Sequence, residues 1–195
     1  MRITGLILAA GLSSRINSFK PILHLNKKPF VNVIAEKLLK VCSDLVIVTG
    51  YKSDIILEII KDYFQEETLR IKLTYNEDFE KGMLSSLQKG ISSAKNSDWI
   101  LFHFVDQPTI PEKFYFDFID QIKPQFNWIQ PSINSCKGHP ILINNTLYNL
   151  ILSLPSNESL RTFKKNKSVK QIIWNCNYPD ILKNINSEED YKNIL

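Results

Sequence analysis

Cysteine and long apolar runs are scarce in this 195-residue chain, and neither sign of charge dominates it. No stretch approaches the roughly 20 apolar residues of a transmembrane helix, and the segment after Arg2 lacks the features of a signal peptide. The three cysteines, Cys42, Cys136 and Cys176, match neither a zinc-site spacing nor a disulfide framework. We therefore expect reduced thiols in a cytoplasmic protein without a membrane partner.

The net charge of +4 is too small to indicate nucleic-acid binding. The one lysine-rich run, FKKNKSVK at 163–170, is interpreted as a solvated surface. The chain also lacks GxxxxGK[ST] and GxGxxG, which disfavours a P-loop enzyme and a dinucleotide dehydrogenase. With 44% apolar and 23% charged residues, the sequence predicts one globular domain over 1–195.

Strands and helices are expected to alternate along the first 125 residues. Strand-like apolar runs occur at 3–9, 44–49, 70–75 and 97–104, of which 70–75 is expected nearer a sheet edge. Stretches with helical spacing follow them, at 29–42, 53–64, 83–94 and 111–122. This order predicts an α/β fold of three layers, a mostly parallel mixed sheet with helices on both faces.

Beyond residue 125 the pattern loosens into a smaller mixed region. Further strands are expected at 127–132, 139–143 and 169–176. Further helices are expected at 145–154, 157–165 and 187–195.

Ligands of parallel sheets bind at the carboxyl ends of the strands, where the loops 10–20, 76–86 and 105–108 should meet. In loop 10–20, a turn at Gly11 exposes backbone N–H groups, and Arg15 and Lys20 add cations suited to a triphosphate. The alternative is an ordinary surface turn with two solvated cations.

Asp106 ends an apolar strand, where its carboxylate suits Mg²⁺. It suits the N-cap of the next helix equally well. Gly82, Ser85 and Ser86 open a helix and allow either close approach of a base or a plain helix start.

Gly138 and His139 precede a strand, where the histidine is either structural or a substrate contact. His103 is expected to pack within its strand.

Six segments together resemble one enzyme family. They are LILAAGLSSRINSFKPIL at 6–23, VIVTGY at 46–51, GMLSSL at 82–87, DQPTIP at 106–111, GHPILI at 138–143 and NINSEEDY at 184–191. In this order they resemble the MobA-like NTP transferases, and within them the molybdenum cofactor cytidylyltransferases. The resemblance implies a glycosyltransferase-A-like, Rossmann-like fold with a nucleotide-binding half, 1–125, and an acceptor-binding half, 126–195.

The implied reaction is Mg²⁺-dependent transfer of CMP from CTP to the terminal phosphate of a molybdopterin-type acceptor, with release of pyrophosphate. A molybdenum hydroxylase would then be the recipient of the product. The resemblance favours cytosine because the chain reads LAAG where the related guanylyltransferases carry LAGG, and adenine stays open. No general base is required, because the acceptor phosphate already carries a negative oxygen.

The same resemblance assigns roles residue by residue. Arg15, Lys20 and Asp106 match the catalytic residues, which clamp the β- and γ-phosphates, contact the α-phosphate and bind Mg²⁺, respectively. The nucleotide-binding positions are Ala9, Ala10, Gly11, Ser13, Arg15, Lys20, Gly82, Ser85 and Ser86. Gly138 and His139 are expected to bind the acceptor.

The chain departs from the family pattern at several positions. Ile16 and Asn17 replace Met-Gly, and Asn26 replaces a glycine. Asn184 and Asn186 stand where aspartates are usual; as metal ligands beside Asp106 they would bring no charge. The two asparagines favour one alternative, a chaperone that binds the mature cofactor without catalysis. A second alternative stays open, a nucleotidyltransferase for a sugar phosphate or another small phosphate ester, although the GMLSSL and GHP segments point away from it.

Overall fold

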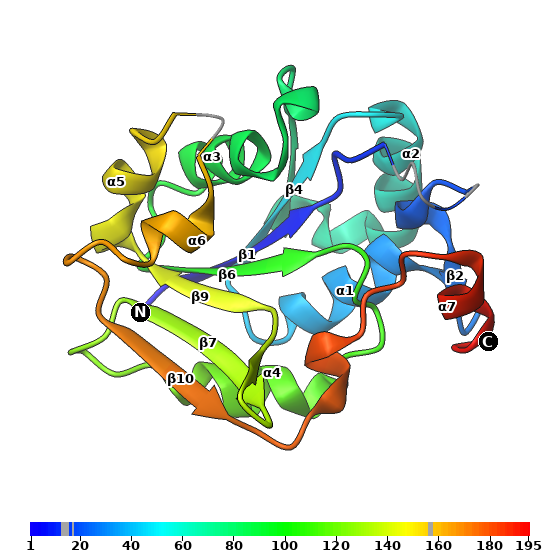
Figure 1. Ribbon diagram of the computed structural model, residues 1–195. Helices are drawn as coiled ribbons and strands as arrows, with labels where there is room; N and C mark the ends of the chain where they lie inside the picture. The colour runs from blue at the N-terminus through cyan, green and yellow to red at the C-terminus, as the bar shows by residue number, and fades with distance from the viewer. Residues whose placement is uncertain (13–15, 17, 156–157) are drawn as a thin grey trace.

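A mixed β-sheet forms the centre of the molecule (Figure 1). The computed structural model describes residues 1–12, 16, 18–155 and 158–195. Within these residues the strand order is β10-β7-β9-β6-β1-β4-β5, and β8 pairs with β7. The strands are β1 (Ile3–Leu8), β4 (Asp44–Thr49), β5 (Ile71–Tyr75), β6 (Trp99–Phe104), β7 (Trp128–Ile133), β8 (Cys136–Lys137), β9 (Ile141–Asn144) and β10 (Gln171–Asn175).

The strands β6, β1, β4 and β5 are parallel neighbours, and β10 is parallel to β7. Strand β9 is antiparallel to both β6 and β7 and joins the two parallel groups. The predicted mostly parallel mixed sheet is therefore confirmed, with β5 at one edge as expected. Because β1, β4, β5 and β6 point the same way, the loops that follow them lie at one edge of the sheet.

Helices cover both faces of this sheet, as predicted. Helices α1 (Phe30–Leu39), α2 (Ser53–Phe64) and α4 (Glu112–Ile119) pack on one face. Helices α3 (Met83–Ser93), α5 (Tyr148–Leu152) and α6 (Leu160–Phe163) pack on the other. No described helix is long and apolar enough to cross a membrane.

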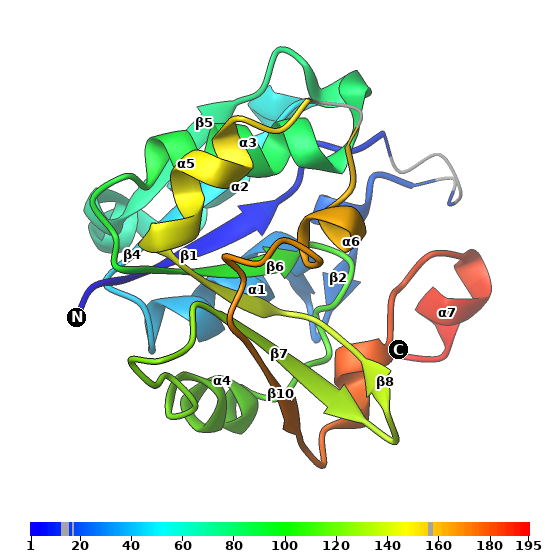
Figure 2. The same ribbon diagram turned by 60° about the vertical axis from the view of Figure 1, so that its left-hand side comes forward.

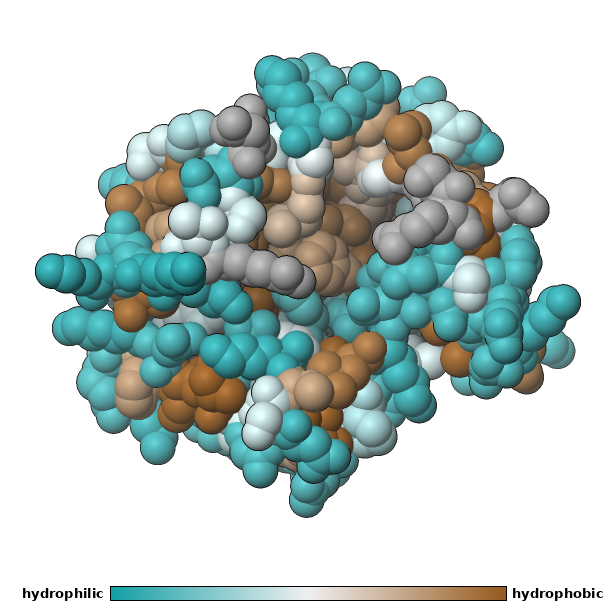
Figure 3. Space-filling view, viewed as in Figure 1, coloured by the Kyte–Doolittle hydropathy of each residue, from teal (hydrophilic) through white to brown (hydrophobic). Residues whose placement is uncertain are grey.

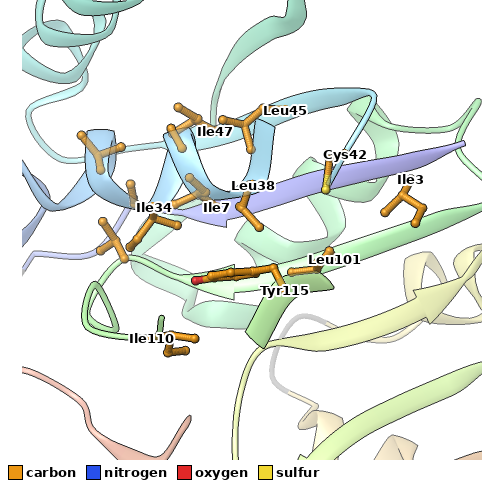
Figure 4. Packing of buried hydrophobic residues seen from close by; sticks show 14 of the residues in the cluster. Ile3, Ile7, Ile34, Leu38, Cys42, Leu45, Ile47, Leu101, Ile110 and Tyr115 are labelled. Atoms are coloured by element: carbon orange, nitrogen blue, oxygen red, sulfur yellow. The ribbon is translucent and has the colours of Figure 1, made fainter. Parts of the chain in front are cut away.

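Alternate residues of the central strands supply the two cores. In β1, Ile3 and Ile7 face α1, whereas Leu6 and Leu8 face α3, and β4 and β6 divide in the same way. Figure 4 shows Ile34 and Leu38 of α1 lying against this first face of the sheet. Burial on both faces explains why these strands are continuous apolar runs in the sequence.

The C-terminal segment returns to the N-terminal half of the chain. Helix α7 (Glu188–Lys192) lies near strand β2 (His24–Leu25) in Figure 1, and Figure 2 shows it standing out from the central sheet. The hydroxyl of Tyr191 donates to the carbonyl of His24 at 3.1 Å and accepts from its amide at 3.2 Å. Ile185 packs in a small core with Leu23 and Phe30. This return brings residues 184–187 to the edge of the sheet at which the functional loops lie.

Two short hairpins were not predicted. Strand β2 pairs with β3 (Lys28–Pro29) across Asn26 and Lys27, and β7 pairs with β8 across Asn134 and Ser135. All four turn residues have positive φ, from 49° to 66°. Such two-residue turns usually carry glycine, so these four residues do not signal a hairpin.

Candidate active site

A cavity of about 340 Å³ opens at the carboxyl ends of β1 and β6. Its volume lies within the range of small-molecule sites. Figure 3 shows a hollow near the centre of this face, with apolar residues on its inner walls and hydrophilic residues around it. The lining comes from four parts of the chain: residues 8–11, residues 20–21, the group Phe79, Gly82, Met83 and Ser86, and residues 104–106.

The turn after β1 forms one wall of the cavity. Ala9, Ala10 and Gly11 all line it. The amide of Ala9 donates to the carbonyl of Val48 at 2.9 Å, and the carbonyl of Ala10 accepts from Tyr51 at 3.2 Å. These bonds to β4 and its loop fix the turn. Two further predicted positions, Ser13 and Arg15, lie outside the described residues, as does Asn17.

Lys20 and Asp106 meet at this cavity. Lys20 begins a 3₁₀ turn (Lys20–Ile22), and only 9% of its side chain is exposed. Its ammonium nitrogen lies 3.4 Å from Oδ2 of Asp106 and 2.6 Å from Oδ1 of Asn186. Three distant parts of the chain therefore place a cation, a carboxylate and an amide around one point.

The loop after β6 holds Asp106 in position from two sides. The backbone carbonyl of Asp106 accepts from the amide of Ile185 at 2.9 Å. Farther along the loop, the Lys37 ammonium donates to the carbonyls of Pro108 and Ile110 at 2.7 Å each, and burial lowers the pKa of this lysine to about 8. The interpretation of Asp106 as a helix N-cap is wrong, because α4 begins at Glu112 after Pro111.

The start of α3 forms the opposite wall. Gly82 has φ of 106°, a conformation that side chains disfavour, and lies with Ser86 at the cavity. Ser85 does not line the cavity, and its hydroxyl lies 2.8 Å from the carbonyls of Asp78 and Gly82. Ser85 therefore stabilises the helix start, whereas Ser86 faces the ligand space.

Asn76, which sequence reasoning missed, orders both serines. Its buried amide nitrogen lies 3.0 Å from each of the Ser85 and Ser86 hydroxyl oxygens, and its oxygen accepts from the Asp78 amide. The only sequence signal was its place in the loop after β5. The apolar lining residues Pro21, Phe79, Met83 and Phe104 carried no signal either, because isolated apolar residues also fill ordinary cores.

The predicted metal ligands are arranged unequally. Asp106 lines the cavity, whereas Asn184 is exposed and outside its lining. The side-chain oxygen of Asn186 accepts a hydrogen bond from Lys20. No cluster of three or more His, Cys, Asp or Glu side chains suited to a metal occurs among the described residues. Any metal here would take its remaining ligands from the substrate and water.

Gly138 and His139 differ in their access to ligand space. A Cβ on Gly138 would lie 2.6 Å from the carbonyl oxygen of Ile181, so Gly138 serves close packing. His139 lines a second cavity, beside Phe104, with ring centroids 4.5 Å apart. Burial, with a smaller contribution from nearby Lys164, lowers the pKa of His139 to about 4 and keeps the ring neutral.

His103 packs in its strand, as predicted. It is fully buried, and burial lowers its pKa to about 3. Its Nδ1 lies 2.6 Å from the carbonyl oxygen of Phe104, which can only accept, so Nδ1 carries the proton. The Tyr115 hydroxyl therefore donates to Nε2, at 2.8 Å.

Comparison with known proteins connects this geometry to a family. Residues 5–172 match the sequence profile described as the MobA-like NTP transferase domain. The chain is 27% identical over 158 residues to the molybdenum cofactor cytidylyltransferase of Escherichia coli K12, a match covering 80% of this chain and 77% of the relative. It is 22% identical over 200 residues to a probable molybdenum cofactor guanylyltransferase of Bacillus cereus, covering 96% and 92%.

Another similarity is partial. Over 103 residues the chain is 32% identical to a D-glycero-alpha-D-manno-heptose 1-phosphate guanylyltransferase of Campylobacter jejuni, covering 49% of this chain and 45% of the relative.

Solved structures with the same fold include a nucleotidyl transferase from Methanothermobacter (TM-score 0.83, 19% identity, 99% and 95% of the two chains). Rv0371c from Mycobacterium tuberculosis is similar too (TM-score 0.81, 17% identity, 100% and 97%). Both similarities support the Rossmann-like α/β fold.

Proposed function

Because the chain belongs to the MobA-like NTP transferase family and is thus a nucleotidyltransferase, we propose that it moves CMP from CTP to the phosphate of a molybdopterin-type acceptor. The observation that carries the proposal is the meeting of Lys20 and Asp106 at the cavity that follows β1 and β6. In the reaction an acceptor phosphate oxygen attacks the α-phosphorus of CTP. As the new P–O bond forms, the bond between the α-phosphorus and the oxygen that bridges to the β-phosphorus breaks. Pyrophosphate leaves with the electron pair of that bond.

Transfer of this kind needs two anionic reactants held in line, with their charge neutralised. Lys20, fixed by Asn186 and Asp106, would stabilise the negative charge that builds up on the α-phosphate. The turn 9–11 would receive the nucleotide, and Arg15, as the family resemblance implies, would hold the β- and γ-phosphates. The acceptor already carries a negative oxygen, so no side chain is assigned as a general base.

The donor set at Asp106 suits Mg²⁺ that arrives with the nucleotide. Mg²⁺ is usually bound by one or two carboxylates together with substrate phosphates and water. Asp106 supplies one carboxylate at the cavity, whereas the side-chain oxygen of Asn186 accepts from Lys20. Bound there, the ion would offset the charge of the phosphates, while Lys20 keeps the Asp106 carboxylate oriented.

The base preference rests on Ala10. Ala10 lies in the wall of the cavity, where the guanylyl branch would carry glycine and lack the methyl group. Less room beside the base favours a pyrimidine. The E. coli cytidylyltransferase, at 27% identity, supports the same choice.

A sugar 1-phosphate acceptor is the second candidate. It is favoured by the 32% identity, over half of the chain, to the heptose 1-phosphate guanylyltransferase. The two candidates share the nucleotide site and differ only in the acceptor.

Turnover of α-³²P-labelled nucleotides separates these candidates. The purified chain would be incubated with Mg²⁺ and each of the four NTPs, with molybdopterin or heptose 1-phosphate as the acceptor. We expect a labelled dinucleotide only when CTP is combined with molybdopterin. One pyrophosphate should be released for each dinucleotide formed. Transfer only to the sugar phosphate would replace the proposal by its alternative.

No pyrophosphate with any NTP would instead favour the non-catalytic cofactor chaperone. In that case the variant with both Asn184→Asp and Asn186→Asp tests whether the amides are the cause. Restored release in the double variant would identify a site that lost its metal-binding charge.

A further inference from the structure

A second cavity of about 670 Å³ adjoins the first. Met83 and Phe104 belong to the linings of both. It lies beyond β6, between α6 and the strands β7 and β9. A ligand whose reactive end reaches Lys20 would extend past Phe104 into this second space.

Positive charge distinguishes the second cavity from the first. Lys137, Lys164 and Lys165 line it, and neither Asp nor Glu occurs among the described residues of its lining. The first cavity combines Lys20 with Asp106. A recess lined by positive charges concentrates anions, because its low-dielectric walls focus the electric field.

Lys164 contacts two residues of the cavity wall. It ends α6, is half-buried, and its ammonium lies 3.1 Å from Oε1 of Gln130 and 5.9 Å from the centre of the Trp128 ring. Gln130 is buried and is fixed in turn by donating to the carbonyl of Gly138 at 3.0 Å. A neutral amide and an aromatic face thus help to hold the ammonium on the wall of the cavity.

His139 provides a neutral polar group between the two cavities. Its ring stacks at a tilt on Phe104, and its Nδ1 is buried with no hydrogen-bond partner among the described residues. A buried ring nitrogen without a partner costs free energy unless a ligand supplies one. The path from Lys20 to Lys164 therefore offers an aromatic wall, a neutral hydrogen-bonding group and then a cation.

We infer that the second cavity holds the body of the acceptor, and that this body carries a second anionic group, separate from the reacting phosphate, which Lys164 binds. The inference rests on the proposed function for the direction of the acceptor. Within the run FKKNKSVK the exposed Lys165, Lys167 and Lys170 agree with the interpretation as a solvated surface, whereas the half-buried Lys164 lines the cavity.

The test compares two aryl phosphates that differ by one charge. Phenyl phosphate and 4-carboxyphenyl phosphate share a flat body and a phosphate, but only the second carries a remote anion. Their dissociation constants would be measured by calorimetry, without nucleotide, for the wild type, Lys164→Met and Lys167→Met. We expect the wild type to bind the carboxylated probe roughly tenfold more tightly, as for a hydrogen bond to a charged group.

Lys164→Met should abolish this preference while phenyl phosphate binds as before, and Lys167→Met should retain it. A wild type that binds neither probe, or that shows no preference, would overturn the inference. So would equal weakening of both probes by Lys164→Met, which would mean that this lysine holds the reacting phosphate. Circular dichroism of each variant checks the fold.

Failure of the proposed function is recognised separately, by CTP binding and pyrophosphate release in the wild type. Those measurements do not involve the aryl probes. If the wild type released no pyrophosphate but still preferred the carboxylated probe, the second cavity would be an anion-binding site in a protein with another activity.

Discussion

The ammonium of Lys20 lies 2.6 Å from the side-chain oxygen of Asn186, although 166 positions separate the two residues in the chain. An amide oxygen orients a cation without neutralising it. A carboxylate at the same distance would form an ion pair and compete with the phosphate for Lys20. The structure thus connects the amide at 186 with the lysine rather than with a metal.

Asn186→Asp should therefore lower activity. We expect kcat/KM for CTP to fall by roughly tenfold, because the new carboxylate pairs with Lys20 and repels the triphosphate. Steady-state pyrophosphate release measures the effect, with the exposed Asn184→Asp as the matched control. A faster enzyme after Asn186→Asp would show that the amide limits metal binding instead.

Asp106→Asn removes one charge and keeps the shape of the side chain. We expect kcat to fall by about 10² to 10³, the size of effect seen when a preorganised electrostatic group is lost. Since the carbonyl of Asp106 still accepts from Ile185, the fold should remain. Asp78→Asn, at an exposed aspartate outside the cavity lining, is the control. Unchanged kcat with an unchanged Mg²⁺ requirement would contradict the assignment.

Lys20→Met and Arg15→Ala should affect different constants. Loss of Lys20 should mainly reduce kcat, because its contact with the α-phosphate strengthens as charge develops there. Loss of Arg15 should mainly raise KM for the nucleotide, because the β- and γ-phosphates are bound before reaction. Initial rates over a range of CTP concentrations separate the two. The reverse pattern would exchange the two roles.

The strands and the ligand edge were predictable because the relevant signals are local. Buried parallel strands are continuous apolar runs, and the polar loop at the end of each run has to lie at the carboxyl edge. The position of Asp106 after β6 followed from this rule alone.

The partners of these residues were not predictable in the same way. Contact between Lys20 and Asn186 depends on how residues 184–187 return to the sheet, and the support of Ser86 by Asn76 depends on the loop after β5. In the run 163–170 the sequence does not show that Lys164 faces a cavity, because α6 is a single short turn without periodicity.

Gly138→Ala should destabilise the protein. The new Cβ would lie 2.6 Å from the carbonyl oxygen of Ile181, a backbone atom that also accepts from His139 and Gln107. We expect a loss of about 1–3 kcal/mol, as for other overpacked sites. Urea denaturation measures it. Gly11→Ala, whose Cβ would meet no atom within 4 Å, should cost less; equal losses would contradict the packing argument.

Acid should destabilise the fold through the buried His103 and the half-buried His139. Burial lowers the pKa of His103 to about 3 and that of His139 to about 4, from an ordinary value of 6.5. Below pH 6.5 the unfolded chain therefore binds protons that the folded chain does not. Stability should decrease as the pH falls from 6.5 to 4, by up to about 1.4 kcal/mol per pH unit for each histidine.

The free energy of unfolding at pH 7, 6, 5 and 4.5 tests this dependence. His139→Gln should reduce the slope of unfolding free energy against pH by the contribution of one proton. Glutamine does not titrate, and the contribution of His103 remains. The exposed His24→Gln is the matched control and should keep the full slope. Lys164 lies near His139 and also lowers its pKa, so Lys164→Met should raise that pKa slightly and end the loss due to His139 at a slightly higher pH. An unchanged slope in His139→Gln would show that its imidazole takes up its proton in the folded state as readily as in the unfolded one.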